Sequence, residues 1–181
     1  MMYIRPLQLS DAPRIAEILV FAWRSAYRGI ISDDILFNER LVSNRIPRFE
    51  DAARNKTEEI YVFDDSIIKA FISVSACRDD DKPKSFELGA IYVDPFMQRQ
   101  GIGAQMMQYF ENLAIQRGFK EACLWTFEKN LTAQALYEKF GYTQDGTKKL
   151  HEAFNAALTR YTKDINKRAV ALPAGAAPLL K

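Results

Sequence analysis

The spacing of apolar residues along the chain separates predicted helices from predicted strands. Between residues 102 and 114, apolar residues recur every three or four positions, which predicts an amphipathic helix. Gly118 stands where a left-handed residue would end that helix. Residues 86–93 and 122–127 are instead densely apolar, which is typical of interior strands. Strand, glycine loop, helix and strand together predict a right-handed crossover between two parallel strands.

The N-terminal part of the chain carries helix-start signals. Residues 2–7 predict a short strand, and Ser10 then predicts the start of a helix that runs to about Tyr27. A second start signal at residues 32–34 predicts another helix, which Pro47 kinks or ends.

Four further segments complete the predicted elements. Residues 60–63 and 67–77 predict two strands joined by a tight turn. A short helix is expected over residues 131–140, followed by a last pair of strands, the second near residues 156–164. The combination of hairpins with a crossover predicts an α/β fold of mixed α+β character.

Length and composition predict one domain. The 181 residues are 48% apolar, which is enough for one core and too short a chain for two ordinary domains. Residues 1–167 are expected to form this domain. Residues 168–181, rich in Ala, Pro and Leu without periodicity, are expected to be a loose tail.

Charge and cysteine content exclude several classes of function. The 25 basic and 23 acidic residues give a net charge of +2 and are interspersed, so no basic stripe indicates nucleic acid or membrane binding. Cys77 and Cys123 lack the spacing of a metal or redox motif, and we expect two buried, reduced thiols. No signal-peptide core and no membrane-length apolar segment occur in the sequence, so we expect a cytoplasmic protein.

A glycine-containing loop between the predicted strand at residues 86–93 and the following helix is the clearest candidate site. It consists of Gln98, Arg99, Gln100, Gly101, Ile102, Gly103 and Ala104. Unpaired N–H groups and the helix dipole favour an anion at such a helix start. A side chain at Gly101 or Gly103 would hold the backbone away from a phosphate, although such glycines often serve turn geometry or close packing alone.

Two other phosphate-binding motifs fit this loop poorly. A nucleoside-triphosphate loop requires a Lys-Ser or Lys-Thr pair, and a dinucleotide-binding turn requires three glycines. The loop has neither, which disfavours a nucleotide-binding regulatory fold.

Several motifs in a fixed order resemble the GCN5-related N-acetyltransferase (GNAT) family. They are Glu87, Leu88 and Ile91 to Pro95, then Gln98 to Gly103, then Asn130, Ala133 and Leu136 to Tyr142. Ile4, Arg5, Pro6 and Asp11, and Trp23, Arg24 and Tyr27 to Gly29, also resemble a common bacterial branch of the family. The resemblance implies a twisted mixed sheet of about seven strands flanked by about four helices, with strands four and five splayed apart.

The resemblance also implies acetyl-CoA as co-substrate, no metal, and direct attack by an amine within a ternary complex. The loop would hold the pyrophosphate, and the backbone at Ile91 and Val93 would hold the pantetheine arm. The Val93 N–H would stabilise the oxyanion that forms when the amine attacks. Relatives are often homodimers, so a homodimer is also possible.

By resemblance, Tyr137 is also a cofactor-binding residue: it matches a tyrosine that in many relatives lies near the CoA sulfur and protonates the departing thiolate. A tyrosine packed beside Leu136 and Phe140 is the alternative. A thiol has a pKa of about 8.5 and a tyrosine one of about 10, so the thiolate is already a fair leaving group and the effect of this tyrosine is limited.

Two carboxylates are candidates for the base that accepts the amine proton. Glu87 occupies the position where many relatives carry the base, with a solvated glutamate as the alternative. Glu128, at the end of the next predicted strand, is the rival, and a chain of water molecules is the third possibility.

Other residues near the resembling motifs have ordinary alternatives. Asn130 is expected to cap a helix and, by resemblance, to contact pantetheine. His151 is expected to be a surface histidine, because nothing in the sequence pairs it with a nucleophile. Trp23, Tyr27 and Arg28 belong either to the acceptor pocket or to core packing, and an aromatic pocket suits polyamines, amino acids, aminoglycosides or a peptide N-terminus alike.

The sequence therefore predicts an acetyl-CoA-dependent N-acyltransferase that acts on a small-molecule or peptide amine. A non-catalytic acyl-CoA-binding module is the alternative. It would keep the loop but would not need Glu87 or Tyr137.

Overall fold

The structure is a computed structural model that describes residues 3–165, so the predicted tail at residues 168–181 lies outside the described residues. Its strands are β1 (Tyr3–Pro6), β2 (Glu59–Asp64), β3 (Ile68–Ala76), β4 (Ser85–Val93), β5 (Glu121–Phe127), β6 (Thr143–His151) and β7 (Ala156–Asp164). Its α-helices are α1 (Ala12–Ala26), α2 (Ile46–Asn55), α3 (Ile102–Gln116) and α4 (Leu131–Lys139). Within residues 3–165, no helix is both long and apolar enough to cross a membrane.

The strands form one mixed sheet in the order β1-β2-β3-β4-β5-β7-β6. Neighbouring strands are antiparallel except β4 and β5, which are parallel. The crossover through α3 explains this, because a connection of that length returns the chain in the same direction. The predicted mixed α/β fold is confirmed.

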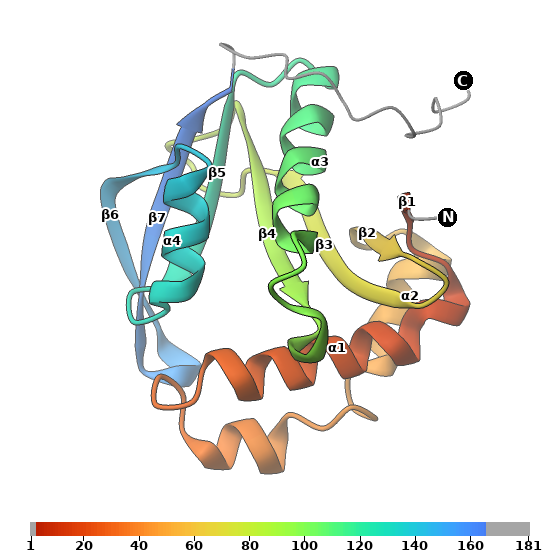
Figure 1. Ribbon diagram of the computed structural model, residues 1–181. Coiled ribbons are helices and arrows are strands. Elements are labelled where there is room, and N and C mark those ends of the chain that lie inside the picture. The colour runs from red at the N-terminus through yellow and green to blue at the C-terminus, as the bar shows by residue number, and fades with distance from the viewer. Residues whose placement is uncertain (1–2, 166–181) are drawn as a thin grey trace.

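Two layers of helices cover the sheet. The apolar stripe of α3, including Met106 and Phe110, packs with Tyr137 of α4 against one face. On the other face, Ile15 of α1 and Phe49 of α2 pack against Val62 of β2. Figure 1 shows α3 and α4 on the same side of the sheet, with α1 running across its end. Burial on both faces explains why the central strands are densely apolar.

The prediction for the segment after Gly29 was partly wrong. A π-helical turn occupies Ile35–Glu39, and α2 begins at Ile46, so Pro47 starts a helix where a helix end or kink was expected. The first turn of a helix is the place where proline fits, because its missing N–H has no partner there and its φ is already helical.

The parallel pair β4 and β5 separates halfway along its length. Pairing runs from Ser85 opposite Glu121 to Leu88 opposite Leu124, and then stops. On its other side, β4 changes register against β3 at Gly89, and such a bulge bends a strand. Figure 1 shows the two strands side by side at one end and apart at the other. The predicted splay is confirmed.

Candidate active site

The separation of β4 from β5 leaves the backbone of β4 unpaired on one edge after Leu88. The N–H of Asp94 donates to the Lys69 carbonyl of β3 at 2.8 Å. Successive backbone groups of a strand point to opposite edges, so the backbone groups of Val93 and Ile91 point away from β3 and into the gap. An extended chain entering the gap would find these groups available.

The glycine loop lies at the end of the same gap. The Asp94 carboxylate accepts a hydrogen bond from the Phe96 N–H at 2.9 Å and forms an ion pair with Arg14, which holds the turn that follows β4. Among residues 3–165, no partner exists for any backbone N–H between residues 98 and 104. Free donors of this kind at the start of a helix favour the binding of an anion.

Backbone conformation accounts for one of the two loop glycines. Gly101 has φ of +78° and open space around it, so the left-handed conformation is what favours glycine. A Cβ on Gly103 would meet Leu136 at 3.7 Å and Val93 at 3.8 Å, which are ordinary contacts. Packing within the protein therefore does not itself require glycine at position 103, and the expectation that a side chain there would hold the backbone away from a phosphate stays a prediction. Arg99 also has a positive φ, of 64°.

Tyr137 lies on α4 and packs against the sheet face that carries α3. It is buried with Tyr142 and Tyr161, whose ring centroids lie 6.4 and 6.0 Å away. Its hydroxyl has no hydrogen-bond partner within the described chain. Burial raises the pKa of Tyr137 above the ordinary value, so the hydroxyl stays protonated at neutral pH and can donate a proton.

A pocket of about 300 Å³ opens beside the gap on the α1 side of the sheet. Its wall includes six Trp, Tyr and Phe side chains, namely Trp23, Tyr27, Tyr92, Trp125, Phe127 and Phe154. Trp23 donates to the Tyr92 hydroxyl at 2.8 Å, and the hydroxyls of Tyr27 and Tyr92 lie 3.2 Å apart. These bonds fix the rings against one another. Trp23 and Tyr27 therefore line the pocket and also pack in the core, whereas Arg28 is exposed and pairs with Asp33.

Glu87 lines this pocket and is held by Arg78. The Glu87 side chain is 4% exposed, and its Oε1 lies 2.5 Å from Arg78 Nη2. The Nε and the backbone N–H of Arg78 both donate to Oε2 at 3.2 Å. The hydrogen bonds to Glu87 raise the pKa of Arg78. Glu87 is thus a buried carboxylate with a fixed orientation.

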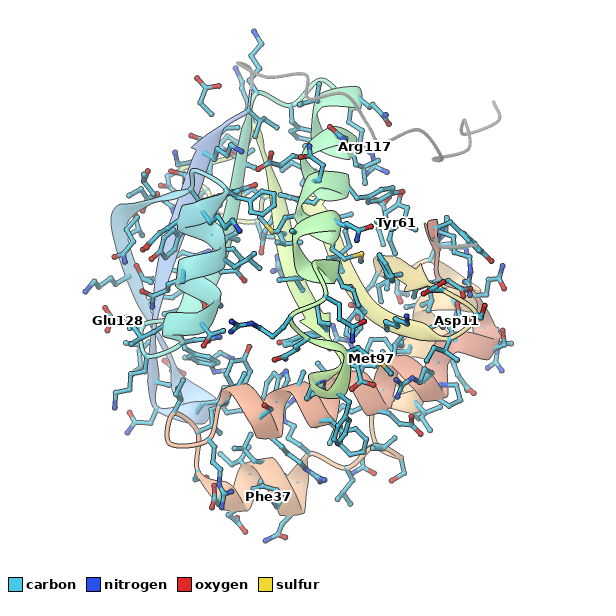
Figure 2. All side chains as sticks on the ribbon, in the orientation of Figure 1. Asp11, Phe37, Tyr61, Met97, Arg117 and Glu128 are labelled. Carbon is cyan, nitrogen blue, oxygen red and sulfur yellow. The ribbon has the colours of Figure 1, made fainter. Side chains whose placement is uncertain are left out.

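Glu128, the rival carboxylate, points elsewhere. Its Oε1 pairs with Lys148 Nζ at 2.5 Å, and it does not contribute to the pocket wall. Figure 2 shows Glu128 across the gap from Met97, which marks the loop end of β4. Of the two candidate bases, Glu87 is therefore the one that lines the pocket.

Comparison with known proteins gives the family. A family model described as "Acetyltransferase (GNAT) family" matches residues 20–142. The chain belongs to the GNAT family of acetyltransferases. Family membership makes the protein an acetyl-CoA-dependent acyltransferase. An uncharacterized N-acetyltransferase of Bacillus subtilis, YuaI, is 29% identical over 133 residues, which cover 72% of this chain and 74% of that protein.

Solved GNAT structures share the fold. The PaiA N-acetyltransferase from Thermoplasma acidophilum, crystallised with coenzyme A, matches with a TM-score of 0.68 and 18% identity, over 88% of this chain and 98% of that one. The putative acetyltransferase YncA from Salmonella typhimurium, crystallised with acetyl-CoA, matches with a TM-score of 0.66 and 19% identity, over 93% and 96% of the two chains.

The sequence predicted the position of Asn130 in this GNAT chain correctly and that of His151 incorrectly. Asn130 caps α4, because its side chain accepts from the Ala133 N–H at 3.3 Å. His151 was expected at the surface, and this was wrong: it is half-buried in the pocket wall, stacked on Phe154 at 4.1 Å between ring centroids. Its Nδ1 is buried and has no partner in the described chain.

Sequence reasoning missed Arg78, Tyr92 and Lys149 as pocket residues of the GNAT site. Tyr92 could have been found, because it lies on the predicted strand one residue before Val93 and must face the opposite side of the sheet. Arg78 and Lys149 carried no local signal, because strand pairing brings them to the pocket from distant parts of the chain.

The two cysteines of the GNAT domain meet across the sheet. Cys77 Sγ and Cys123 Sγ lie 3.0 Å apart as free thiols. Cys123 is fully buried as predicted, whereas Cys77 is only half-buried. Burial raises the pKa of Cys123, so this thiol is neutral at physiological pH. Within residues 3–165, no cluster of three or more His, Cys, Asp or Glu side chains could hold a metal ion.

Proposed function

We propose that this GNAT protein transfers the acetyl group of acetyl-CoA to a primary amine by direct attack in a ternary complex. One observation carries the proposal: the gap between β4 and β5 has free loop N–H groups at one end and a pocket with a buried carboxylate beside it. Donor and acceptor could therefore approach from opposite sides of the sheet.

The residues present fit acetyl-CoA. The free N–H groups of residues 98–104 would bind its pyrophosphate. The outward backbone groups of Ile91 and Val93 would bind the pantetheine amides as an added strand would. Asn130 fixes the start of α4 on the other side of the gap. When bound, acetyl-CoA would supply the activated acetyl group as a thioester.

Replacement of Gly101 by valine is expected to weaken acetyl-CoA binding about tenfold or more. A β-branched residue is strained at positive φ and would displace N–H groups whose bonds to a charged oxygen contribute about 1.5–3 kcal/mol each. Isothermal titration with acetyl-CoA measures the effect.

Gly118→Val is the matched control for this variant. Gly118 has φ of +81°, is exposed, and also has open space around it. It therefore carries the same backbone strain. Figure 2 shows its neighbour Arg117 at the opposite end of α3 from the loop. Equal losses of affinity in both variants would contradict a pyrophosphate site at residues 98–104.

The proposed function itself is tested by thermal unfolding with acetyl-CoA, followed by thiol release over a panel of amines. Ligand at a hundredfold excess over its dissociation constant adds about 2.7 kcal/mol to the free energy of unfolding. No stabilisation by acetyl-CoA would refute the proposal. Stabilisation without thiol release from any amine would favour the non-catalytic binding module.

Proton transfers in the proposed reaction balance as follows. Glu87, directly or through water, takes one proton from the ammonium group of the acceptor and passes it to solvent. The free amine then forms the C–N bond, the C–S bond breaks, and the Val93 N–H stabilises the negative oxygen. Tyr137 protonates the sulfur and is restored by the second proton that leaves the nitrogen. The products are an amide, a thiol and one proton.

The two candidate bases are separated by their glutamine variants. Glu87→Gln is expected to lower kcat about tenfold at neutral pH, since water can still remove the proton, and to abolish the fall in kcat at acidic pH at saturating amine. Glu128→Gln is expected to leave both unchanged, because Glu128 faces Lys148 rather than the pocket. An unaltered acidic fall in both variants would assign proton removal to water.

A further inference from the structure

The wall of the aromatic pocket carries a buried carboxylate and two exposed cations. The carboxylate is Glu87, and the cations are Arg78 and Lys149. The two side chains of this ion pair differ in burial: Glu87 is 4% exposed and Arg78 is 75% exposed. The negative charge therefore lies inside the pocket and the positive charge at its mouth.

Lys149 adds to the positive charge at the mouth. Its Nζ lies 3.8 Å from the centre of the Trp125 ring, and its side chain is 48% exposed. The nearest carboxylate is Asp79, at 3.9 Å. Asp79 is already bound by Arg160 at 3.0 Å and by the Trp125 N–H at 2.9 Å. Lys149 is therefore left with capacity for another anion.

A further cation lies behind the aromatic wall. The Arg40 guanidinium stacks over Trp23 at 4.3 Å and over Phe154 at 5.0 Å. With Arg78 and Lys149, it makes the surroundings of the pocket unfavourable for an acceptor that carries several positive charges.

We infer that the acceptor is a free amino acid with an apolar or aromatic side chain. Its ammonium group would face Glu87, its carboxylate would face Arg78 and Lys149, and its side chain would pack among the aromatic rings. A free amino acid carries its ammonium group and its carboxylate close together. Glu87 and Arg78 also hold a negative and a positive charge close together, so each charge of the amino acid would face the opposite charge on the protein. Arg–carboxylate pairs are among the stronger charge-assisted hydrogen bonds in proteins.

This orientation suits the reaction. The carboxylate holds the acceptor at the mouth, so the nitrogen lies at the deep end, beside the carboxylate proposed to take its proton. The volume of about 300 Å³ is at the lower end of the range of about 300–1,000 Å³ for ligand pockets, which favours a single amino acid over an aminoglycoside. The inference rests on the proposed acetyl transfer.

The test compares L-phenylalanine with L-phenylalaninamide and spermidine as acceptors, each with acetyl-CoA. The amide keeps the amine and the ring but lacks the carboxylate. We expect kcat/KM for L-phenylalanine to exceed that for the amide by about tenfold or more, which corresponds to one charge-assisted hydrogen bond. L-phenylalanine, but not spermidine, should also stabilise the CoA-bound protein against heat, which measures binding without turnover.

Lys149→Gln tests the position of the carboxylate. The ratio of kcat/KM for L-phenylalanine to that for its amide is expected to fall about fivefold, as for a partly exposed ion pair. Lys148→Gln is the matched control, because Lys148 is the neighbouring residue, is 61% exposed and does not line the pocket. This control should leave the ratio unchanged.

Failure of the inference is distinguishable from failure of the proposed function. If the amide or spermidine is acetylated as well as L-phenylalanine, or if another amine is acetylated and L-phenylalanine is not, the amino-acid inference is wrong and the proposed acetyl transfer stands. If acetyl-CoA does not bind, or if it binds but no amine of the panel releases thiol, the proposed function fails and the inference fails with it.

Discussion

Replacement of Tyr137 by phenylalanine is expected to lower kcat by about tenfold to a thousandfold, which is within or just below the usual effect of a general acid. The hydroxyl is buried, has no partner within the described chain, and has a raised pKa because of that burial. It therefore remains a proton donor across neutral pH. Steady-state thiol release at saturating acetyl-CoA measures the change.

Tyr142→Phe is the control for Tyr137→Phe. Tyr142 is 1% exposed and packs in the same core, with its ring centroid 6.4 Å from that of Tyr137. Loss of its hydroxyl tests the general effect of removing a buried oxygen from this core. Acetyl-CoA affinity should be unchanged in both variants, and an unchanged kcat in Tyr137→Phe would remove Tyr137 from the mechanism.

Replacement of Arg160 by methionine is expected to destabilise the fold by about 3 kcal/mol, at the lower end of the cost of breaking a buried ion pair. The Arg160 side chain is 3% exposed and binds Asp79, Asp81 and Asp145 at 2.5 to 3.0 Å. Asp145 would be left partly buried without a cation, and Asp79 would keep only Lys149, at 3.9 Å. Urea unfolding followed by circular dichroism measures the change in the free energy of unfolding.

Arg48→Met provides the comparison for an exposed pair. Arg48 is 51% exposed and binds Glu58 through two hydrogen bonds, so its loss should cost less than about 1 kcal/mol. If both variants lose the same free energy of unfolding, the Arg160 cluster contributes no more to stability than an exposed ion pair does.

The cost of Arg160→Met should also depend on pH. Hydrogen bonds from Arg160 lower the pKa of Asp81. A carboxylate with a lowered pKa stabilises the fold above its unfolded-state pKa, and this contribution is lost as pH falls through the folded-state value. The difference in stability between wild type and variant should therefore narrow below about pH 4.

The error at Pro47 shows the limit of reading a single residue. Proline ends a helix in its interior and begins one in its first turn. Which applies depends on where the neighbouring turn ends, and here the π-helical turn ends before Arg40. The sequence correctly indicated a helix boundary at Pro47. Packing of Phe49 and Ala52 against the sheet decided that this boundary is the start of a helix and not its end.

The error at His151 has a different cause. Charged residues such as Lys149 and Glu152 stand near it in the sequence, and β6 is exposed along most of its length. The pairing of His151 with Ala156 places its ring beside Phe127 and Phe154. A contact of this kind follows from strand register and leaves no trace in local composition.

The sequence alone determined the parts of this protein that depend on local geometry. The helix period after Gly101, the left-handed turn at Gly101 and the apolar strand before the loop all arise from residues close together in the chain. These features predicted the crossover, which the structure confirms, and an anion at the start of α3, whereas the pyrophosphate of acetyl-CoA was implied by the resemblance to the GNAT family.

Only the tertiary structure decided which side chains surround the aromatic pocket. Arg78 reaches Glu87 across neighbouring strands, Lys149 comes from β6, and Trp23 comes from α1. Their meeting depends on where β4 and β5 stop pairing and on the register of each strand. Register is set by burial of whole sheet faces, so it is a property of the assembled core rather than of any one segment.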